Sequence, residues 1–170
     1  GMPQGTPPAI GADPIARAGT RASRYANEIS QVAAEEGVPA DVLAAILDTE
    51  GSGEDSVSPA GARGLMQVVP GQGYDLPGED ARIPIVSIRQ GARALKDKYR
   101  ITGTWEEAGA AYFGYGTDAG GMTTNAYRQR YLDNRARYGG TQAPAPTGPS
   151  MTTPPQAEQT PEAQRQGLEG

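Results

Sequence analysis

Residues 39–70 read PADVLAAILDTEGSGEDSVSPAGARGLMQVVP. In the first part of this stretch, apolar residues recur three or four positions apart, which predicts a helix that opens at Pro39. Glycine and serine then become frequent over residues 51–63, which predicts a loop. The apolar stripe of the helix consists of Val42, Leu43, Ile46 and Leu47.

Helical spacing of apolar residues also occurs on both sides of this stretch. Ser23 is predicted to cap a helix that precedes it, and Pro84 to open a long helix that follows it. Thr104 and Glu107 form a capping-box pair for a further helix, and Thr124 is predicted to cap the last one. No alternation typical of a large sheet is present, so we predict a mainly α fold.

Composition divides the chain into three parts. Every aromatic residue lies between Tyr25 and Tyr138, and both ends are rich in proline and small residues. Such ends bury too little apolar surface to offset the entropy lost on ordering. We therefore predict a flexible N-terminal linker over residues 1–23, a single folded domain over residues 24–138, and a disordered tail rich in Pro, Thr and Gln over residues 139–170.

The residue types that are missing exclude several kinds of chemistry. The 170 residues include no Cys and no His, which excludes disulfides, thiol nucleophiles and catalytic or metal-binding imidazoles. Acid–base chemistry near neutral pH is then expected from a carboxyl group in a suitable environment, ahead of Lys96, Lys98 or a tyrosine. The net charge of −5 argues against a nucleic-acid partner. No membrane span is predicted, and no signal peptide is visible at the start.

Glu50 occupies an unusual place for a charged residue. It lies four residues after Ile46 and three after Leu47, so it continues the apolar stripe of its helix. It also lies at the C-terminal end of that helix, where the helix dipole disfavours a negative charge. Desolvation and the dipole both favour the protonated carboxyl, which is the form that a general acid needs. The alternative is a frayed helix end whose glutamate points into water.

The residues after Glu50 support the catalytic interpretation. The run EGSGEDSVSPAGARGLMQVVP closely resembles the signature of the soluble lytic transglycosylase and goose-type lysozyme family, glycoside hydrolase family 23. In that family a catalytic Glu ends a helix and is followed by a loop, Gly-Leu-Met-Gln and Pro. AAYFG at residues 110–114 resembles the family's Ala-Tyr-Asn-x-Gly element. The resemblance implies a lysozyme-like domain that acts on peptidoglycan glycan strands without metal or cofactor.

The resemblance also implies a reaction. A lytic transglycosylase cleaves the β-1,4 bond between N-acetylmuramic acid (MurNAc) and N-acetylglucosamine (GlcNAc) and forms 1,6-anhydro-MurNAc. Glu50 would act first as general acid and then as general base. The enzyme would work on the cell wall, in the periplasm or outside the cell, as a virion-associated or secreted protein or as part of a larger protein or secretion assembly.

Further site residues are implied by the matched motifs. Ser58 corresponds to a family serine that positions the muramyl N-acetyl group, with a loop-capping serine as the alternative. Gly64 would let a sugar approach the backbone, and Gln67 would hydrogen-bond the glycan. Met66 would line the cleft or pack in the core. Tyr112 would project towards Glu50 or pack in the core, and Tyr127 matches a later family tyrosine at the cleft border.

Two departures from the family pattern leave alternatives open. Gly51 stands where the family has a serine after the catalytic residue, and Phe113 replaces the Asn of the Ala-Tyr-Asn element. If Glu54 or Asp55 reached the cleft, it would orient a water and give a hydrolytic muramidase. A non-catalytic wall-binding module or virion structural module is the remaining alternative.

Overall fold

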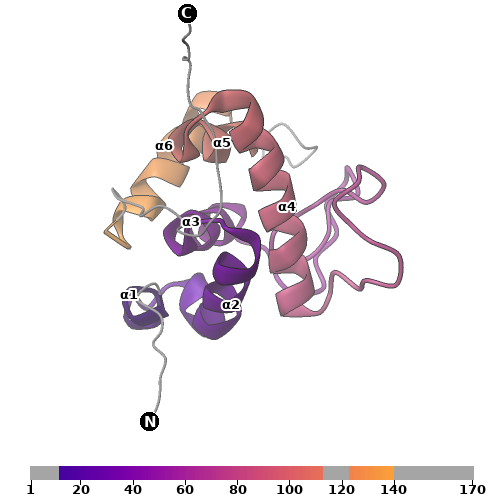
Figure 1. The fold of residues 1–170 in the computed structure, drawn as a ribbon, viewed down its shortest axis with the longest axis horizontal. Coiled ribbons are helices and arrows are strands. Elements are labelled where there is room, and N and C mark those ends of the chain that lie inside the picture. Colours follow the sequence, from indigo (N-terminus) through magenta and orange to yellow (C-terminus); the bar gives the residue numbers. More distant parts are fainter. Residues whose placement is uncertain (1–11, 113–122, 140–170) are drawn as a thin grey trace, which may run out of the picture.

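The computed structural model describes residues 12–112 and 123–139 of the chain. These residues form α1 (Ala12–Arg17), the 3-10 helix η1 (Arg21–Tyr25), α2 (Ala26–Glu36), α3 (Ala40–Glu50), α4 (Pro84–Thr102), α5 (Trp105–Ala111) and α6 (Thr124–Ala136), as Figure 1 shows. No strand occurs in these two ranges. The predicted mainly α fold class is confirmed.

Helix α3 is the centre of the fold. Residues 42–47 are inaccessible to solvent, as expected for a helix that is apolar nearly all round. Helices α2 and α6 pack against α3, and α4 runs along the side of the molecule in contact with α2 and α5 (Figure 1). The last turn of α3 is therefore held between segments from both ends of the described chain.

Two predicted caps lie at other residues. The last helix is capped by Thr123, whose Oγ1 accepts a hydrogen bond from the amide of Ala126, so Thr124 is the first helical residue. Ser23 does not cap α2, because it lies inside η1 and its Oγ accepts from the amide of Thr20. The adjacent hydroxyl residues Thr123 and Thr124 make the start of α6 hard to locate from sequence.

The N-terminal part of the described chain differs from the predicted linker over residues 1–23. Residues 12–17 form α1, and the side chain of Ile15 is buried in the core. The segment was predicted as a linker because the residues around Ile15 are small, but the single Ile15 side chain is enough to pack into the core. The predicted tail over residues 139–170 lies, apart from Gly139, outside the described residues.

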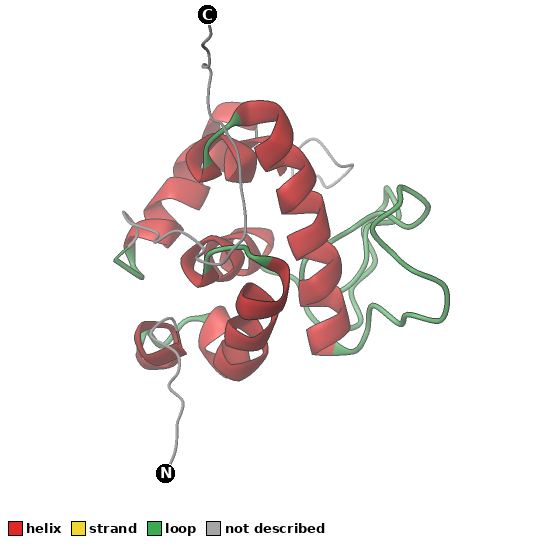
Figure 2. Cartoon of the chain, viewed as in Figure 1, coloured by secondary structure: helices red, strands yellow, loops and turns green. Residues whose placement is uncertain are grey.

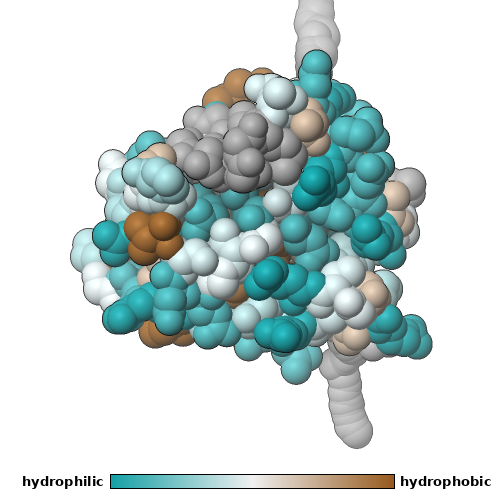
Figure 3. Space-filling view, turned by 180° about the vertical axis from the view of Figure 1, so that it is seen from behind, coloured by the Kyte–Doolittle hydropathy of each residue, from teal (hydrophilic) through white to brown (hydrophobic). Residues whose placement is uncertain are grey.

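Residues 51–83 connect α3 to α4 as a long loop on the outer side of α4 (Figure 2). Within it, Arg63 forms isolated β-bridges with Val57 and with Val68, which fold residues 57–68 back on themselves. The surface seen from behind is mostly hydrophilic, with separate hydrophobic spots (Figure 3). In the described residues, no helix has the length and apolarity needed to cross a membrane.

Candidate active site

Glu50 is the last residue of α3 and is only 8% exposed. Gly51 follows with φ 64°, a left-handed conformation that ends the helix and turns the chain away from it. The hydroxyl of Tyr127 donates a hydrogen bond of 2.6 Å to Oε2 of Glu50. The carboxyl is therefore buried and oriented by a partner on another helix, and does not extend into water.

Tyr127 is fully buried on α6. Burial, followed by the charge of Glu50 and the hydrogen bond to it, raises the pKa of Tyr127 well above its ordinary value of 10. The hydroxyl therefore stays protonated over the whole range in which an enzyme works. Tyr127 acts as a permanent hydrogen-bond donor to the Glu50 carboxyl.

The Gly-Leu-Met-Gln segment forms a buried turn. The amide of Met66 donates to Oγ of Ser87 at 3.1 Å, and the carbonyl of Met66 accepts from the hydroxyl of Tyr112 at 2.6 Å. The Met66 side chain lies in the core against Gly91, where an added Cβ would come within 2.5 Å of the methionine Cε. The main chain of Met66 is thus fixed on both sides, while its side chain serves as packing.

Gly64 is required here by two independent constraints. Its φ is 73°, which L side chains rarely adopt, and an added Cβ would lie 2.4 Å from the carbonyl oxygen of Ala81. The predicted role of Gly64 was a close approach of a sugar to the backbone. In the structure, the positive φ and the close approach of Ala81 already require a glycine at this position, independently of any bound sugar.

Gln67 has the only positive φ among the non-glycine residues of the described ranges, at 53°. Its side-chain Nε2 donates to the carbonyl of Gly64 at 2.9 Å, which closes the turn. The residue is 4% exposed. Backbone conformations of this kind carry a cost and cluster at binding and catalytic sites.

The other two predicted site residues, Ser58 and Tyr112, form hydrogen bonds within the protein. Oγ of Ser58 accepts from the amide of Ala62 at 3.0 Å, which is the turn-capping contact named as its alternative. Tyr112 is buried and bonds to the Met66 carbonyl, and its proximity contributes to the raised pKa of Tyr127. Tyr112 therefore belongs to the same cluster as the Glu50–Tyr127 pair.

Glu54 and Asp55, the two acidic residues that follow Glu50 in the loop, are solvent-exposed. The hydroxyl of Tyr25 donates to Oε2 of Glu54 at 2.7 Å, which ties this carboxylate to η1. Asp55 is also exposed. In the described residues, no group of three or more acidic side chains is placed to hold a metal ion.

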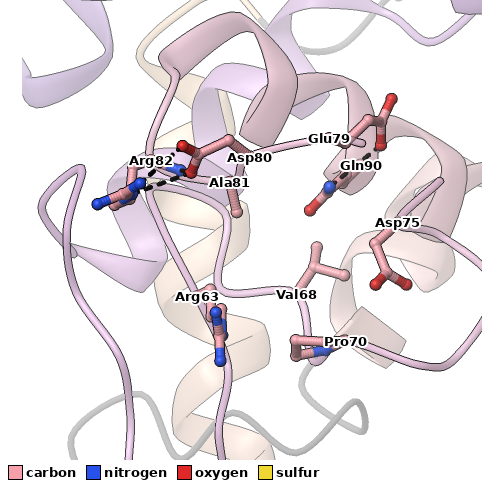
Figure 4. Close-up of a pocket in the computed structure, with 9 residues that line it drawn as sticks. All are labelled: Arg63, Val68, Pro70, Asp75, Glu79, Asp80, Ala81, Arg82 and Gln90. Atoms are coloured by element: carbon pink, nitrogen blue, oxygen red, sulfur yellow. Dashed lines mark hydrogen bonds and ion pairs between the residues drawn. The ribbon is translucent and has the colours of Figure 1, made fainter. Parts of the chain in front are cut away.

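A pocket of about 410 Å³ lies between the long loop and α4 (Figure 4). Arg63 and Val68, which flank the Gly-Leu-Met-Gln turn, form part of its wall, and none of the predicted site residues lines it. Polar residues make up most of the remainder, and two of them, Asp80 and Arg82, form an ion pair. The lining consists of Arg63, Val68, Pro70, Asp75, Glu79, Asp80, Ala81, Arg82 and Gln90.

Several polar residues beside Glu50 were not predicted as site residues from the sequence. Nδ2 of Asn134 donates to the Thr49 hydroxyl at 2.9 Å, and the Tyr138 hydroxyl donates to Asp48. One signal was available, because Tyr127, Asn134 and Tyr138 are spaced to share one face of a helix. Their partners on α3 could not be identified without knowing that α3 and α6 pack together.

The central helix of this helical domain thus ends in a buried, hydrogen-bonded glutamate, a carboxyl group placed as a general acid or base would be. The sequence profile of the Transglycosylase SLT domain matches residues 27–131, more than half of the chain, and the chain belongs to this family. Neither curated proteins nor solved structures gave a significant match. Membership supports a lysozyme-like domain that acts on the peptidoglycan of the cell wall.

Proposed function

We propose that the protein is a lytic transglycosylase that cleaves the MurNAc-β-1,4-GlcNAc bond and forms 1,6-anhydro-MurNAc. The observation that supports this proposal most directly is the buried carboxyl of Glu50, hydrogen-bonded by Tyr127 at 2.6 Å. A buried carboxyl held in one orientation is suited to exchange a proton with a bound substrate, first as general acid and then as general base.

The reaction needs only one carboxyl group. Protonated Glu50 gives its proton to the glycosidic oxygen, and the bond from that oxygen to the anomeric carbon of MurNAc breaks. The resulting carboxylate then takes the proton of the MurNAc 6-hydroxyl, while the oxygen of that hydroxyl attacks the anomeric carbon. Glu50 ends protonated, as it began, and no water is consumed. Tyr127 holds Oε2 throughout and keeps the carboxyl in one orientation.

The Gly-Leu-Met-Gln turn and its neighbours form the rest of the proposed site. Gln67 and Ser58 contact the glycan, and Gly64 and Met66 shape the turn on which Gln67 stands. Tyr112 fixes the main chain of this turn through its 2.6 Å bond to the Met66 carbonyl. The strained backbone of Gln67 supports a binding role, because such strain is retained where it has a use.

A hydrolytic muramidase is the second candidate. Tyr25 holds the Glu54 carboxylate in the loop that starts directly after Glu50, and a carboxylate in that loop would be able to orient a water molecule. Residues 51–63, the part of this loop between Glu50 and Gly64, lack the longer Asp-containing insert of goose-type lysozymes, which favours the transglycosylase. Either enzyme would act on the wall as a virion-associated or secreted protein, or within a larger assembly.

Digestion of purified sacculi by the wild type and by Glu50→Gln tests the proposal. We expect anhydro-muropeptides from the wild type and a loss of about 1,000-fold or more in Glu50→Gln, because the amide cannot donate and retrieve the proton. Glu54→Gln is the matched control: its amide oxygen still accepts from Tyr25, so this variant should keep its turnover. Muropeptides with reducing ends would favour the muramidase instead, and undiminished turnover in Glu50→Gln would refute the assigned role of Glu50.

A further inference from the structure

Asp48, two residues before Glu50, is held by segments that lie outside the family match. The amide of Ala22 donates to its Oδ1 at 2.9 Å, and the hydroxyl of Tyr138 donates to its Oδ2. Oγ1 of Thr20 lies 2.7 Å from the same Tyr138 hydroxyl. The two ends of the described chain therefore meet at a carboxyl group in the last turn of α3.

Thr49 is anchored in the same way. Its hydroxyl donates to the carbonyl of Ala45 at 2.6 Å and accepts from Nδ2 of Asn134 at 2.9 Å. Thr49 and Asn134 are 4% and 7% exposed, so this contact is shielded from water. A hydrogen bond in such surroundings is stronger than at the surface and more costly to leave unmade.

The chain that leaves Glu50 is held by η1. Nη1 of Arg21 donates to the carbonyl of Ser52 at 3.3 Å, and Tyr25 bonds Glu54. Oγ of Ser52 in turn donates to the carbonyl of Glu50 at 3.3 Å. The residues before and after Glu50 are thus attached to the same N-terminal segment.

We infer that residues 20–25, Asn134 and Tyr138, together called the flanking clasp, position the Glu50 carboxyl for the proposed reaction. The last turn of a helix lacks part of its main-chain bonding and frays without partners. Here three successive residues, Asp48, Thr49 and Glu50, each have a side-chain partner on or just after α6. A displacement of about 1 Å at a catalytic group can lower the rate by about 100-fold.

Tyr138 and Tyr131 provide a matched pair of positions for a test. Both are buried tyrosines supplied by the C-terminal part of the described chain, and each donates one hydrogen bond from its hydroxyl. Tyr131 donates to the carbonyl of Trp105, on α5, and Tyr138 to Asp48, on α3. Phenylalanine keeps the ring at either position. Tyr131→Phe removes the bond to Trp105, whereas Tyr138→Phe removes the bonds to Asp48 and Thr20, and only this variant loosens the clasp.

The experiment measures kcat and KM on sacculi for Tyr138→Phe and Tyr131→Phe. We expect kcat to fall about 10-fold in Tyr138→Phe with KM within about twofold of the wild type, because positioning affects the chemical step more than binding. Tyr131→Phe should keep kcat within about twofold although it also loses thermal stability with its bond to Trp105. Equal kcat losses in the two variants, or a wild-type kcat in Tyr138→Phe, would overturn the inference.

Thr49 gives a second test that does not depend on the tyrosines. Thr49→Val keeps the shape but removes the hydroxyl, whereas Thr49→Ser keeps the hydroxyl and both of its bonds. We expect kcat to fall about 10-fold in the valine variant and to recover in the serine variant; no difference between them would count against the clasp. The inference rests on the proposed function, since a wild type without turnover would overturn both, whereas an unaffected Tyr138→Phe would overturn only the clasp.

Discussion

The loop over residues 51–83 joins two regions that are held very differently. Directly before the loop, the last two residues of α3 have buried hydrogen bonds from Tyr127 and Asn134 on α6, both far away in sequence. Where the loop approaches α4, its own residues form ion pairs, of which Glu79–Arg93 is part-buried and Asp80–Arg82 is exposed. Glu79 receives two bonds from Arg93, at 2.8 and 2.9 Å, and Asp80 pairs with the exposed Arg82.

This difference separates contacts that position a group from contacts that stabilise a loop. Buried hydrogen bonds between distant segments fix side chains in one arrangement, and their loss is felt at the group they hold. Surface ion pairs are screened by salt and contribute little each. We therefore expect changes beside α3 to reduce activity, and changes beside α4 to alter stability and its dependence on pH.

Tyr127→Phe should give the largest effect, at the α3 end. The variant removes the donor to Oε2 of Glu50 and keeps the ring, so we expect kcat on sacculi to fall about 100-fold. Tyr131→Phe is again the comparison, since its hydroxyl contacts Trp105 instead. If Tyr127→Phe kept a kcat within twofold of the wild type, the contacts beside α3 would not differ in function from those beside α4.

Gly64→Ala tests the region between the two ends. The new Cβ would clash with the Ala81 carbonyl at 2.4 Å in a backbone with positive φ, so we expect the free energy of unfolding to fall by about 2 kcal/mol. Gly61 also has a positive φ but open space around it, so Gly61→Ala should cost about 1 kcal/mol. Chemical denaturation of both variants measures the difference, and equal losses would show that the clash is relieved.

The smallest effect is expected at the α4 end and depends on pH. The hydrogen bonds from Arg93 lower the pKa of Glu79 to about 2 from an ordinary 4.5. The carboxylate therefore stabilises the fold above about pH 4.5, and this contribution is lost as the pH falls towards 2. Arg93→Gln should lower stability by about 1 kcal/mol at neutral pH, and its difference from the wild type should shrink over that interval.

Arg82→Gln is the control for this pH measurement. Its ion pair with Asp80 is exposed, so we expect no measurable change in Tm at any pH between 2 and 7. If Arg93→Gln instead lowered the stability equally at every pH, Arg93 would act through packing or through its bond with the Tyr74 carbonyl. Thermal unfolding followed by circular dichroism distinguishes these results.

Local pattern predicted most of the helices, because apolar spacing, Pro84 and the Thr104 cap act within a few residues. Glu50 was identifiable because it continues an apolar stripe, which is unusual for a charged residue. Its bond to Tyr127 joins positions 77 apart in sequence and depends on the packing of α3 against α6, which no local pattern encodes. Ile15 was missed because a single apolar side chain among small residues resembles a linker.

The position of α6 in the chain has a consequence for biosynthesis. The ribosome makes α3, with Glu50, long before it makes the helix that supplies Tyr127. Until α6 has emerged, the nascent polypeptide exposes part of an apolar central helix, and the glutamate at its end lacks the hydrogen bond from Tyr127. On the proposed mechanism, glycan cleavage can begin only when synthesis of the folded unit is nearly finished, so order of translation itself delays the appearance of a wall-degrading activity.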